Sequence, residues 1–297
     1  MSHIPVLLDE ALHYLDPKPG DFIIDGTLDG GGHAKEIVNK ILPRGIFLGI
    51  DLDPDMIAKT KPIIESQMFS PTATAIFEQG NYADLPKILK KNKLPKANGL
   101  FLDLGFSSQQ MEAGRGLSFG KDEPLDMRYD PGGEITAAEV VNSWTEKELG
   151  DLFLAYGEER YSRTIAREII QSRKKKRIIR TAELTEIIER SVPKNYEQGR
   201  INPATRVFQA LRIIVNDEIR NLETVLSIVH EIVEHQGRVV IISFHSLEDR
   251  MVKNKFRDLA NDQGATLLTK KPIIASAPEM EKNPRSRSAK LRALRLN

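Results

Sequence analysis

The amino-acid sequence predicts an α/β fold, a doubly wound parallel sheet with an inserted all-helical domain. Short apolar runs alternate with amphipathic helices as far as residue 103, and the alternation resumes near residue 237 after a long helical stretch. Four of the apolar runs lead to a polar or aromatic residue. We expect residues 1–105 and 218–297 to form the sheet domain and residues 106–217 to form the helical insertion.

The first predicted strand, Phe22–Ile24, ends in Asp25 and opens into a loop rich in glycine. A helix with Leu8, Leu12 and Leu15 at helical spacing precedes it, and a helix over residues 34–41 follows. Glycine adopts positive φ readily and lets a backbone approach a ligand closely. Because the spacing is not G-x-G-x-x-G, the loop alone is equally compatible with a tight turn and with a cofactor site.

The second predicted strand, residues 45–51, ends in Asp51. Asp51 follows Asp25 by about two dozen residues, near the interval at which nucleotide-binding α/β folds provide the acid that binds ribose. Asp53, directly before Pro54 and a predicted helix over 54–66, is the better candidate for the helix cap. This favours Asp51 as a ligand over a solvated strand-end residue.

The third and fourth predicted strands, residues 74–77 and 99–103, flank a helix over 84–91. The third leads to Tyr82, which fits the core as well as it fits stacking on an adenine ring. The fourth ends in Asp103. Parallel sheets bind ligands at the carboxyl ends of their strands, so Asp25, Asp51, Tyr82 and Asp103 are predicted to line one site.

The pattern changes after residue 105. Residues 105–128 show no period, which is typical of a functional loop. Helices are predicted over 137–143, 145–156, 162–174 and 181–190, and one long amphipathic helix over 205–235. A buried strand over 237–244 leads to His245, and residues 261–284 show no period. Residues 290–297 form a basic apolar tail that either adds an edge strand or lies in a nucleic-acid groove.

The composition narrows the class of protein. The 297 residues suffice for one to two domains. Neither an apolar run of about 18 residues nor an export signal is present, so we expect no membrane span and a cytoplasmic protein. The absence of cysteine excludes disulfides, thiolate catalysis and cysteine-ligated metal centres, and no spacing demands a metal.

Charge is segregated along the chain, although the net charge is only +1. Residues 160–180 hold nine Lys or Arg against Glu168 alone, and residues 282–297 hold six with no acid. Local basic patches attract phosphate backbones whatever the total charge. For either run taken alone, a solvated helix face or a frayed tail is the better explanation.

These stretches together resemble the S-adenosylmethionine-dependent methyltransferases that modify the exocyclic N4 of a cytidine in bacterial small-subunit (16S) ribosomal RNA. The motifs include Asp25-Gly-Thr-Leu-Asp-Gly-Gly-Gly-His33, Asp103-Leu-Gly-Phe-Ser-Ser108 and Ile242-Ser-Phe-His-Ser-Leu-Glu-Asp-Arg250. Further stretches lie at residues 3–10, 115–119, 124–128, 156–160, 202–212 and 283–288, so the resemblance spans nearly the whole chain.

The resemblance implies a class I methyltransferase (Rossmann-like) sheet with an inserted helical domain for substrate recognition. It implies S-adenosyl-L-methionine as the cofactor, with Asp51 on the ribose hydroxyls and Tyr82 beside the adenine. The cofactor residues implied are Asp25, Gly31, Gly32, His33, Asp51, Tyr82, Asp103 and Gln110. Without the resemblance, His33 is better explained as a structural residue at a helix start. The sequence departs from the family at Asp29, where glycine is expected, at Gln109 (proline) and at Asn202 (histidine).

The implied reaction is methyl transfer to an amine whose lone pair is delocalised into the cytosine ring. Such a poor nucleophile must be held in line and relieved of a proton. By analogy we assign this task to Asp103 with Ser107 and Ser108. His245 is a second candidate, unless it is a core histidine satisfied by Glu248 or Asp249. Proposed phosphate contacts are Arg163, Arg167, Arg173, Lys174, Lys175, Arg206, Arg212, Arg285 and Arg287.

Two other functions are compatible with parts of the sequence. A nicotinamide oxidoreductase is disfavoured by the glycine spacing. A non-catalytic RNA-binding factor in ribosome assembly, with a retained cofactor pocket, is the alternative that stays open. Also open are the nucleotide modified, whether the substrate is naked RNA or an assembled small subunit, and whether the protein is a monomer or a homodimer.

Overall fold

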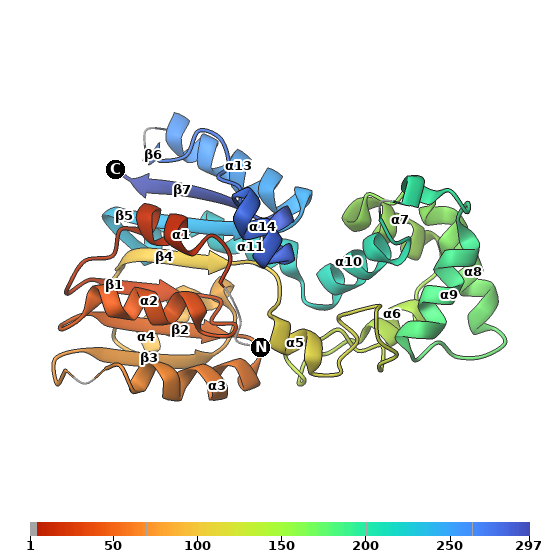
Figure 1. Ribbon diagram of the computed structural model, residues 1–297, viewed down its shortest axis with the longest axis horizontal. Helices are drawn as coiled ribbons and strands as arrows, with labels where there is room; N and C mark the ends of the chain where they lie inside the picture. Colours follow the sequence, from red (N-terminus) through yellow and green to blue (C-terminus); the bar gives the residue numbers. More distant parts are fainter. Residues whose placement is uncertain (1–4, 69, 200, 263) are drawn as a thin grey trace. The chain divides into compact units, whose positions relative to one another are not determined.

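The computed structural model describes residues 5–68, 70–199, 201–262 and 264–297. His3 and Ile4, which open one of the stretches named above, lie outside the described residues. The chain forms two compact units (Figure 1): Met1–Ser107 with Ile219–Asn297, and Ser108–Glu218. These bounds lie within two residues of the predicted domain boundaries. We call them the sheet unit and the helical unit.

The sheet unit contains a seven-stranded sheet in the order β3-β2-β1-β4-β5-β7-β6. The strands are β1 Phe22–Asp25, β2 Ile46–Asp51, β3 Thr74–Gln79, β4 Ala97–Asp103, β5 Val233–Ser243, β6 Ala265–Leu267 and β7 Lys290–Leu296. β1 to β5 are parallel, and β7 is antiparallel to both β5 and β6. The chain order reverses direction between β1 and β4, so this is the topological switch point where α/β sheets bind ligands.

The prediction that the C-terminal tail forms an edge strand or a nucleic-acid contact is wrong. The tail is β7, which lies inside the sheet between β5 and β6, and β6 is the edge. Leu291 and Leu294 face opposite sides of the sheet, and both are fully buried. Arg292, one of the two arginines of this strand, is buried because its Nε donates to Asp249 Oδ1 at 2.7 Å.

Helices cover both faces of the sheet (Figure 1). They are α1 Leu8–Leu15, α2 Gly32–Ile41, α3 Pro54–Glu65, α4 Leu85–Lys91, α11 Glu218–Ser227, α12 Val229–Ile232, α13 Ser246–Asn261 and α14 Ala277–Lys282. Side chains alternate along each strand: Phe101 packs with α1 and α2, whereas Leu100 and Leu102 pack with α4, α11 and α13. Each such fully buried side chain stabilises the fold by about 1.5–3 kcal/mol.

The helical unit contains α5 Ser108–Glu112, α6 Ala137–Ser143, α7 Glu146–Gly157, α8 Ser162–Arg173, α9 Thr181–Ser191 and α10 Ala204–Val215. The four helices predicted between residues 137 and 190 are confirmed to within a residue at each end. Capping boxes fix two of their starts: Thr136 with Glu139, and Thr145 with Glu148.

The single long helix predicted over residues 205–235 is wrong. The chain instead forms α10, α11 and the short α12, and β5 already begins at Val233. The first break lies at Asn216, whose side chain accepts from Tyr129 N at 2.7 Å and donates to Met127 O at 2.8 Å. Asp217 follows in the left-handed region with φ of 50°. These contacts hold the chain out of helical geometry although its apolar period continues.

Residues 261–284, for which no period was found, contain β6 and α14. Among the described residues, no helix is both long and apolar enough to cross a bilayer.

Candidate active site at the strand ends

Three buried carboxylates lie at the carboxyl ends of neighbouring strands. Asp25 ends β1, Asp51 ends β2 and Asp103 ends β4. β1 pairs with both other strands in parallel, so the three strand ends meet at one edge of the sheet. The exposed fractions are 1% for Asp25, 7% for Asp51 and 6% for Asp103. The structure therefore brings together the three acids that the sequence singled out.

The loop after β1 is tied to the strand ends by hydrogen bonds. Thr27 N donates to Asp25 Oδ1 at 3.1 Å, and Thr27 Oγ1 accepts from Asp103 N at 2.6 Å. Gly31 precedes α2 with φ of 77°, and a Cβ there would lie 2.8 Å from the Thr60 side chain. Both the left-handed backbone and the close approach therefore require glycine at position 31.

Asp51 is fixed by backbone groups on both carboxylate oxygens. Its Oδ2 accepts from Asp29 N at 3.0 Å, and its Oδ1 accepts from Asp53 N at 2.8 Å. Asp53, as predicted, caps the next helix, because its Oδ1 accepts from Asp55 N at 3.1 Å. An ionised carboxylate can accept about four hydrogen bonds, so a group held in this way can also serve two neighbouring hydroxyl groups.

His33, the second residue of α2, is buried and lies between Val6 and Asp103. Its Nε2 is 2.9 Å from Val6 O, and since a carbonyl only accepts, that nitrogen carries the proton. Its Nδ1 is 3.5 Å from Asp103 Oδ2. The ring also contacts Phe101, with centroids 4.7 Å apart. The contact with Val6 supports the structural explanation of His33, and the contact with Asp103 brings it to the carboxylate cluster.

The cluster is short of positive charge. Burial, and after it the charge of Glu248, raise the pKa of Asp103 to about 8. Burial also raises the pKa of Asp25 well above its ordinary value, against the hydrogen bond from Thr27 N, and the charges of Asp103 and Asp51 add to the increase. Among the described residues, no hydrogen-bond donor reaches Asp103 Oδ1. Such a site attracts a cation or hydrogen-bond donors.

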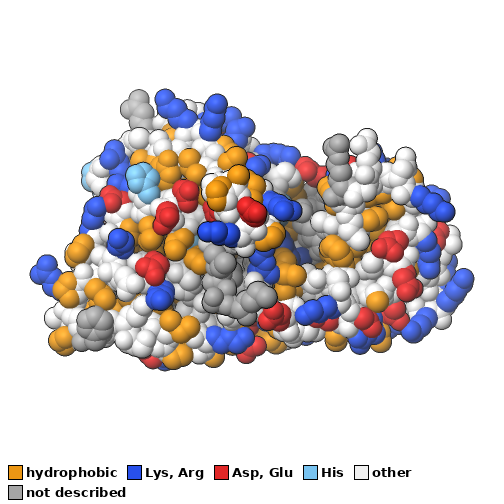
Figure 2. Space-filling model, viewed as in Figure 1, with side chains coloured by type: hydrophobic (Ala, Val, Ile, Leu, Met, Phe, Trp, Pro, Cys, Tyr) orange, Lys and Arg blue, Asp and Glu red, His pale blue; other side chains and the backbone are white. Residues whose placement is uncertain are grey.

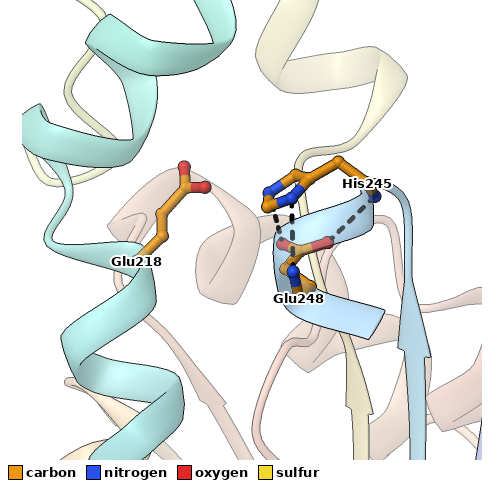
Figure 3. A group of neighbouring side chains, drawn as sticks. All are labelled: Glu218, His245 and Glu248. Atoms are coloured by element: carbon orange, nitrogen blue, oxygen red, sulfur yellow. Dashed lines mark hydrogen bonds and ion pairs between the residues drawn. The ribbon is translucent and has the colours of Figure 1, made fainter. Parts of the chain in front are cut away.

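His245 and Glu248 face each other at the end of β5 (Figure 3). His245 is the N-cap of α13, and its Nδ1 accepts from Glu248 N at 3.4 Å. Glu248 Oε2 accepts from Phe244 N at 2.9 Å, and its Oε1 lies 3.2 Å from His245 Nε2, close enough for an ion pair without hydrogen-bond alignment. Of the two acids offered as its partner, Glu248 is the one found; Asp249 pairs with Arg292.

Sequence reasoning did not count Glu248 as a site residue. Its charge nevertheless acts on Asp103, and its carboxylate orients the His245 ring. A capping box after a strand is the signal that identifies such a glutamate. Here it was obscured because the cap is His245 instead of Ser, Thr, Asp or Asn.

The other predicted site residues divide between the two units. Tyr82 begins a 3₁₀ turn after β3 and is half-buried against the core. Ser107, the last residue of the sheet unit, is buried, and its Oγ donates to Met56 Sδ at 3.4 Å. Gly32 opens α2. Ser108 and the buried Gln110 belong to α5 of the helical unit.

Two of the arginines predicted to contact phosphate already donate hydrogen bonds within the helical unit. Arg173 Nη1 donates to Val141 O at 2.8 Å and to Trp144 O at 2.6 Å, at the end of α6. Arg212 pairs with Glu218, with Nε to Oε1 at 2.9 Å, and both side chains are largely buried. Both guanidinium groups therefore already have partners within the helical unit, which favours a structural role for these two arginines.

The remaining basic residues of α8 and the segment after it are exposed, namely Arg163, Arg167, Lys174 and Lys175. Figure 2 shows Lys and Arg side chains along the rim of the helical unit where Figure 1 draws α8 and α9. Arg206 is partly buried, with Nη1 3.1 Å from Glu197 Oε1. Arg287 is exposed and Arg285 partly exposed, both in the sheet unit.

The strand order, the antiparallel β7 and the acids at the switch point define a class I S-adenosylmethionine-dependent methyltransferase. The whole sequence, residues 1–297, matches the MraW methylase family, and the chain belongs to that family.

The relatives agree with this membership. The chain is 41% identical over 310 residues to the ribosomal RNA small subunit methyltransferase H of Syntrophobacter fumaroxidans, which covers 99% of this chain and 96% of the relative. It is 44% identical over 291 residues to the protein of the same name from Synechococcus elongatus, covering 98% and 93%. Among solved structures, NSun6 from Pyrococcus horikoshii is 12% identical with a TM-score of 0.45, covering 99% of this chain and 52% of that one. That likeness is too distant to carry an argument.

Proposed function

We propose that this protein transfers the methyl group of S-adenosylmethionine to the exocyclic N4 of a cytidine in small-subunit ribosomal RNA. The relatives described above carry the name of a small-subunit ribosomal RNA methyltransferase. Within the structure, the observation that carries the proposal is the group of buried acids Asp25, Asp51 and Asp103 at the switch point. When bound, the cofactor supplies an electrophilic methyl group on a positively charged sulfur.

The residues of the cluster fit this cofactor. Asp51, held in place by two backbone N–H groups, is a carboxylate that can accept from the two ribose hydroxyls. Asp25 and Asp103 provide the negative potential that a sulfonium and an ammonium group require. Gly31, Gly32 and His33 lie in the loop and first turn that follow β1. In this proposal Tyr82 contacts the adenine, and Gln110 is a further cofactor residue.

Asp103 is the residue we assign to the amine. During transfer the carbon–sulfur bond breaks, a carbon–nitrogen bond forms, and N4 loses one proton. The buried Asp103 Oδ1 has the geometry of an unused acceptor. Its pKa of about 8 in the free protein is lowered by a bound cation, so that Asp103 ionises on cofactor binding and can then take up the proton. Ser107 and Ser108 follow it in the chain as further hydrogen-bonding groups. His245, held by Glu248, is the second candidate for contact with the base or for passing on the proton.

The substrate is bound through its phosphates in this proposal. Arg163, Arg167, Lys174 and Lys175 on the helical unit and Arg285 and Arg287 on the sheet unit supply positive charge. A cytidine must leave its stack to reach a cofactor, which costs least in single-stranded or unpaired RNA. A ribosomal substrate assigns the protein to the cytoplasm.

The test is methyl transfer from labelled S-adenosylmethionine into unmodified small ribosomal subunits and, in parallel, into the RNA stripped from them. Nucleoside mass analysis should find N4-methylcytidine, and the better substrate shows whether the assembled subunit is recognised. The Asp103→Asn variant should bind the RNA but lose about 100-fold or more in turnover. Cofactor binding without any methyl incorporation would instead favour an RNA-binding assembly factor.

A further inference from the structure

Asp29, in the loop between β1 and α2, has a side-chain carboxyl group that the fold does not use. Its backbone is held in place, since its N–H donates to Asp51 Oδ2 at 3.0 Å and its carbonyl accepts from Thr60 Oγ1 at 3.2 Å. Within the described part of the chain, its carboxylate forms no hydrogen bond and no ion pair. Its φ of 47° lies in the left-handed region, where glycine is the least strained residue. The side chain at this position is therefore not explained by folding.

The charges around Asp29 are those of the cofactor cluster. Protein packed around the carboxylate raises its pKa well above the ordinary value, and the charges of Asp103, Asp51 and Asp25 raise it further in that order. The guanidinium of Arg285 opposes them. Asp29 is thus a fourth acid beside the three strand-end acids. A separate observation indicates that these four acids bind a ligand. Asp103 Oδ1 is buried and has no hydrogen-bond partner among the described residues.

We propose that Asp29 makes this site distinguish the cofactor from its demethylated product. This inference rests on the proposed function. S-adenosylmethionine carries a positive sulfonium, whereas S-adenosylhomocysteine is a neutral thioether of otherwise the same shape, so contacts with adenine, ribose and the amino-acid group bind both alike. The contacts with the methyl group and the field at the sulfur separate them. A fourth negative charge strengthens that field and so favours exchange of spent product for fresh cofactor.

The same arrangement links cofactor binding to protons. In the free protein burial, and after it the repulsion from neighbouring acids, including Glu248 beside Asp103, keeps protons on Asp25, Asp29 and Asp103, and Arg285 only partly offsets this at Asp29. A bound cation favours the ionised acids and releases protons. The affinity for S-adenosylmethionine should therefore rise with pH, and the affinity for the neutral product should change much less.

The experiment compares Asp29→Asn and Asp29→Gly with the wild-type protein by titration calorimetry. Asparagine keeps the shape of the side chain and tolerates the left-handed backbone, and glycine removes the backbone strain. Both variants remove the carboxylate, and a change seen in both cannot come from one structural defect. The matched control is Glu65→Gln, an exposed carboxylate at the end of α3 with a side chain 52% exposed. Each protein is titrated with S-adenosylmethionine and with S-adenosylhomocysteine at pH 8, in two buffers of different ionisation enthalpy.

We expect both Asp29 variants to lower the ratio of the Kd for S-adenosylhomocysteine to the Kd for S-adenosylmethionine by about three- to tenfold, the size of one charge acting in a partly exposed site. Fewer protons should be released on cofactor binding, and Glu65→Gln should match the wild type. A ratio unchanged in both variants, in proteins that bind both ligands, overturns the role of Asp29 and leaves the methyltransferase proposal standing. A wild-type protein that binds neither ligand overturns both.

Discussion

At the scale of single residues, the buried acids at the strand ends say most about the chemistry of the protein. Asp103 has one oxygen beside His33 and the other without a hydrogen-bond partner among the described residues. An isolated buried charge is costly, so the group holds a proton instead. Asp103 therefore couples protonation to folding as well as to ligand binding.

This coupling predicts how stability depends on pH. The pKa of Asp103 rises from 3.8 to about 8 on folding, so between these values the folded protein binds more protons than the unfolded chain. The stabilisation is complete below the lower value and is lost as the pH rises through about 8. The free energy of unfolding of the ligand-free protein should therefore fall as the pH rises from about 5 to about 8 and level off above that, as measured by urea denaturation.

The Asp103→Asn variant should show a shallower fall over the same pH range, because the amide cannot ionise. Asp55→Asn, an exposed carboxylate on α3, serves as the control and should keep the wild-type slope. Equal slopes for Asp103→Asn and the wild type would mean that Asp103 is ionised throughout this range.

At the scale of elements, α8 combines two roles on two faces. Ile165, Ala166 and Ile169 are fully buried, while its exposed face and the following segment are basic. Arg173 ends the helix and donates to the carbonyl groups at the end of α6 instead of facing solvent. Basic residues adjacent in sequence therefore differ in exposure and in their partners, and substitutions can test them separately.

The triple variant Arg163→Gln, Lys174→Gln, Lys175→Gln should weaken RNA binding and reduce the salt dependence of log K by about 0.7–0.9 for each phosphate that is no longer neutralised. Its unfolding free energy should stay within about 0.5 kcal/mol of the wild type for each exposed position. Filter binding across a salt series and urea denaturation measure the two quantities.

Arg173→Gln is the matched comparison and should behave in the opposite way. Removal of its bonds to Val141 O and Trp144 O should lower the unfolding free energy by about 1–3 kcal/mol while the salt slope remains unchanged. A reduced slope in this variant would return Arg173 to the set of phosphate contacts.

The junction between α10 and α11 is a second element whose form depends on one side chain. Asn216→Ala removes the bonds to Met127 O and Tyr129 N and leaves buried backbone groups without partners. We expect a decrease of about 1–3 kcal/mol in unfolding free energy. Glu223→Gln, exposed on α11, is the control for a neutral change nearby. If Asn216→Ala costs no more than this control, the break between the helices has another cause.

At the scale of the whole molecule, the two units differ in the number of chain segments that form them. The helical unit is one continuous segment, whereas the sheet unit joins Met1–Ser107 with Ile219–Asn297. Strands from both segments form one uninterrupted sheet, since β4 pairs with β5 and β5 with β7. The sheet also has a core on each face drawn from both segments. The sheet unit therefore contains what a fold of its own requires.

This organisation predicts that the sheet unit folds without the insertion. A chain in which a flexible Gly/Ser linker replaces Ser108–Glu218 should unfold in a single cooperative transition by circular dichroism. The full-length protein measured alongside provides the reference. A broad, non-cooperative transition would show that the sheet needs the helical unit to fold.

The features that depend on neighbouring residues could be predicted from the amino-acid order. The apolar period predicted β1 to β5 and the four helices between residues 137 and 190, and the acids at strand ends followed from those strands. Asp53 as a cap was equally local, because its partner is Asp55. Patterns of this kind are readable because secondary structure and capping depend on side chains only a few positions apart.

The features that depend on contacts between residues distant in the sequence became known from the folded structure alone. β7 lies inside the sheet because it pairs with β5, and Arg292 is buried because it donates a hydrogen bond to Asp249. Asn216 ends a helix because its side chain donates to Met127 O. Arg173 donates to Val141 O, and the charge of Glu248 acts on Asp103. Neither partner can be predicted from the sequence. A side chain's partner, and with it the pKa and exposure on which function depends, is fixed only when the chain has folded.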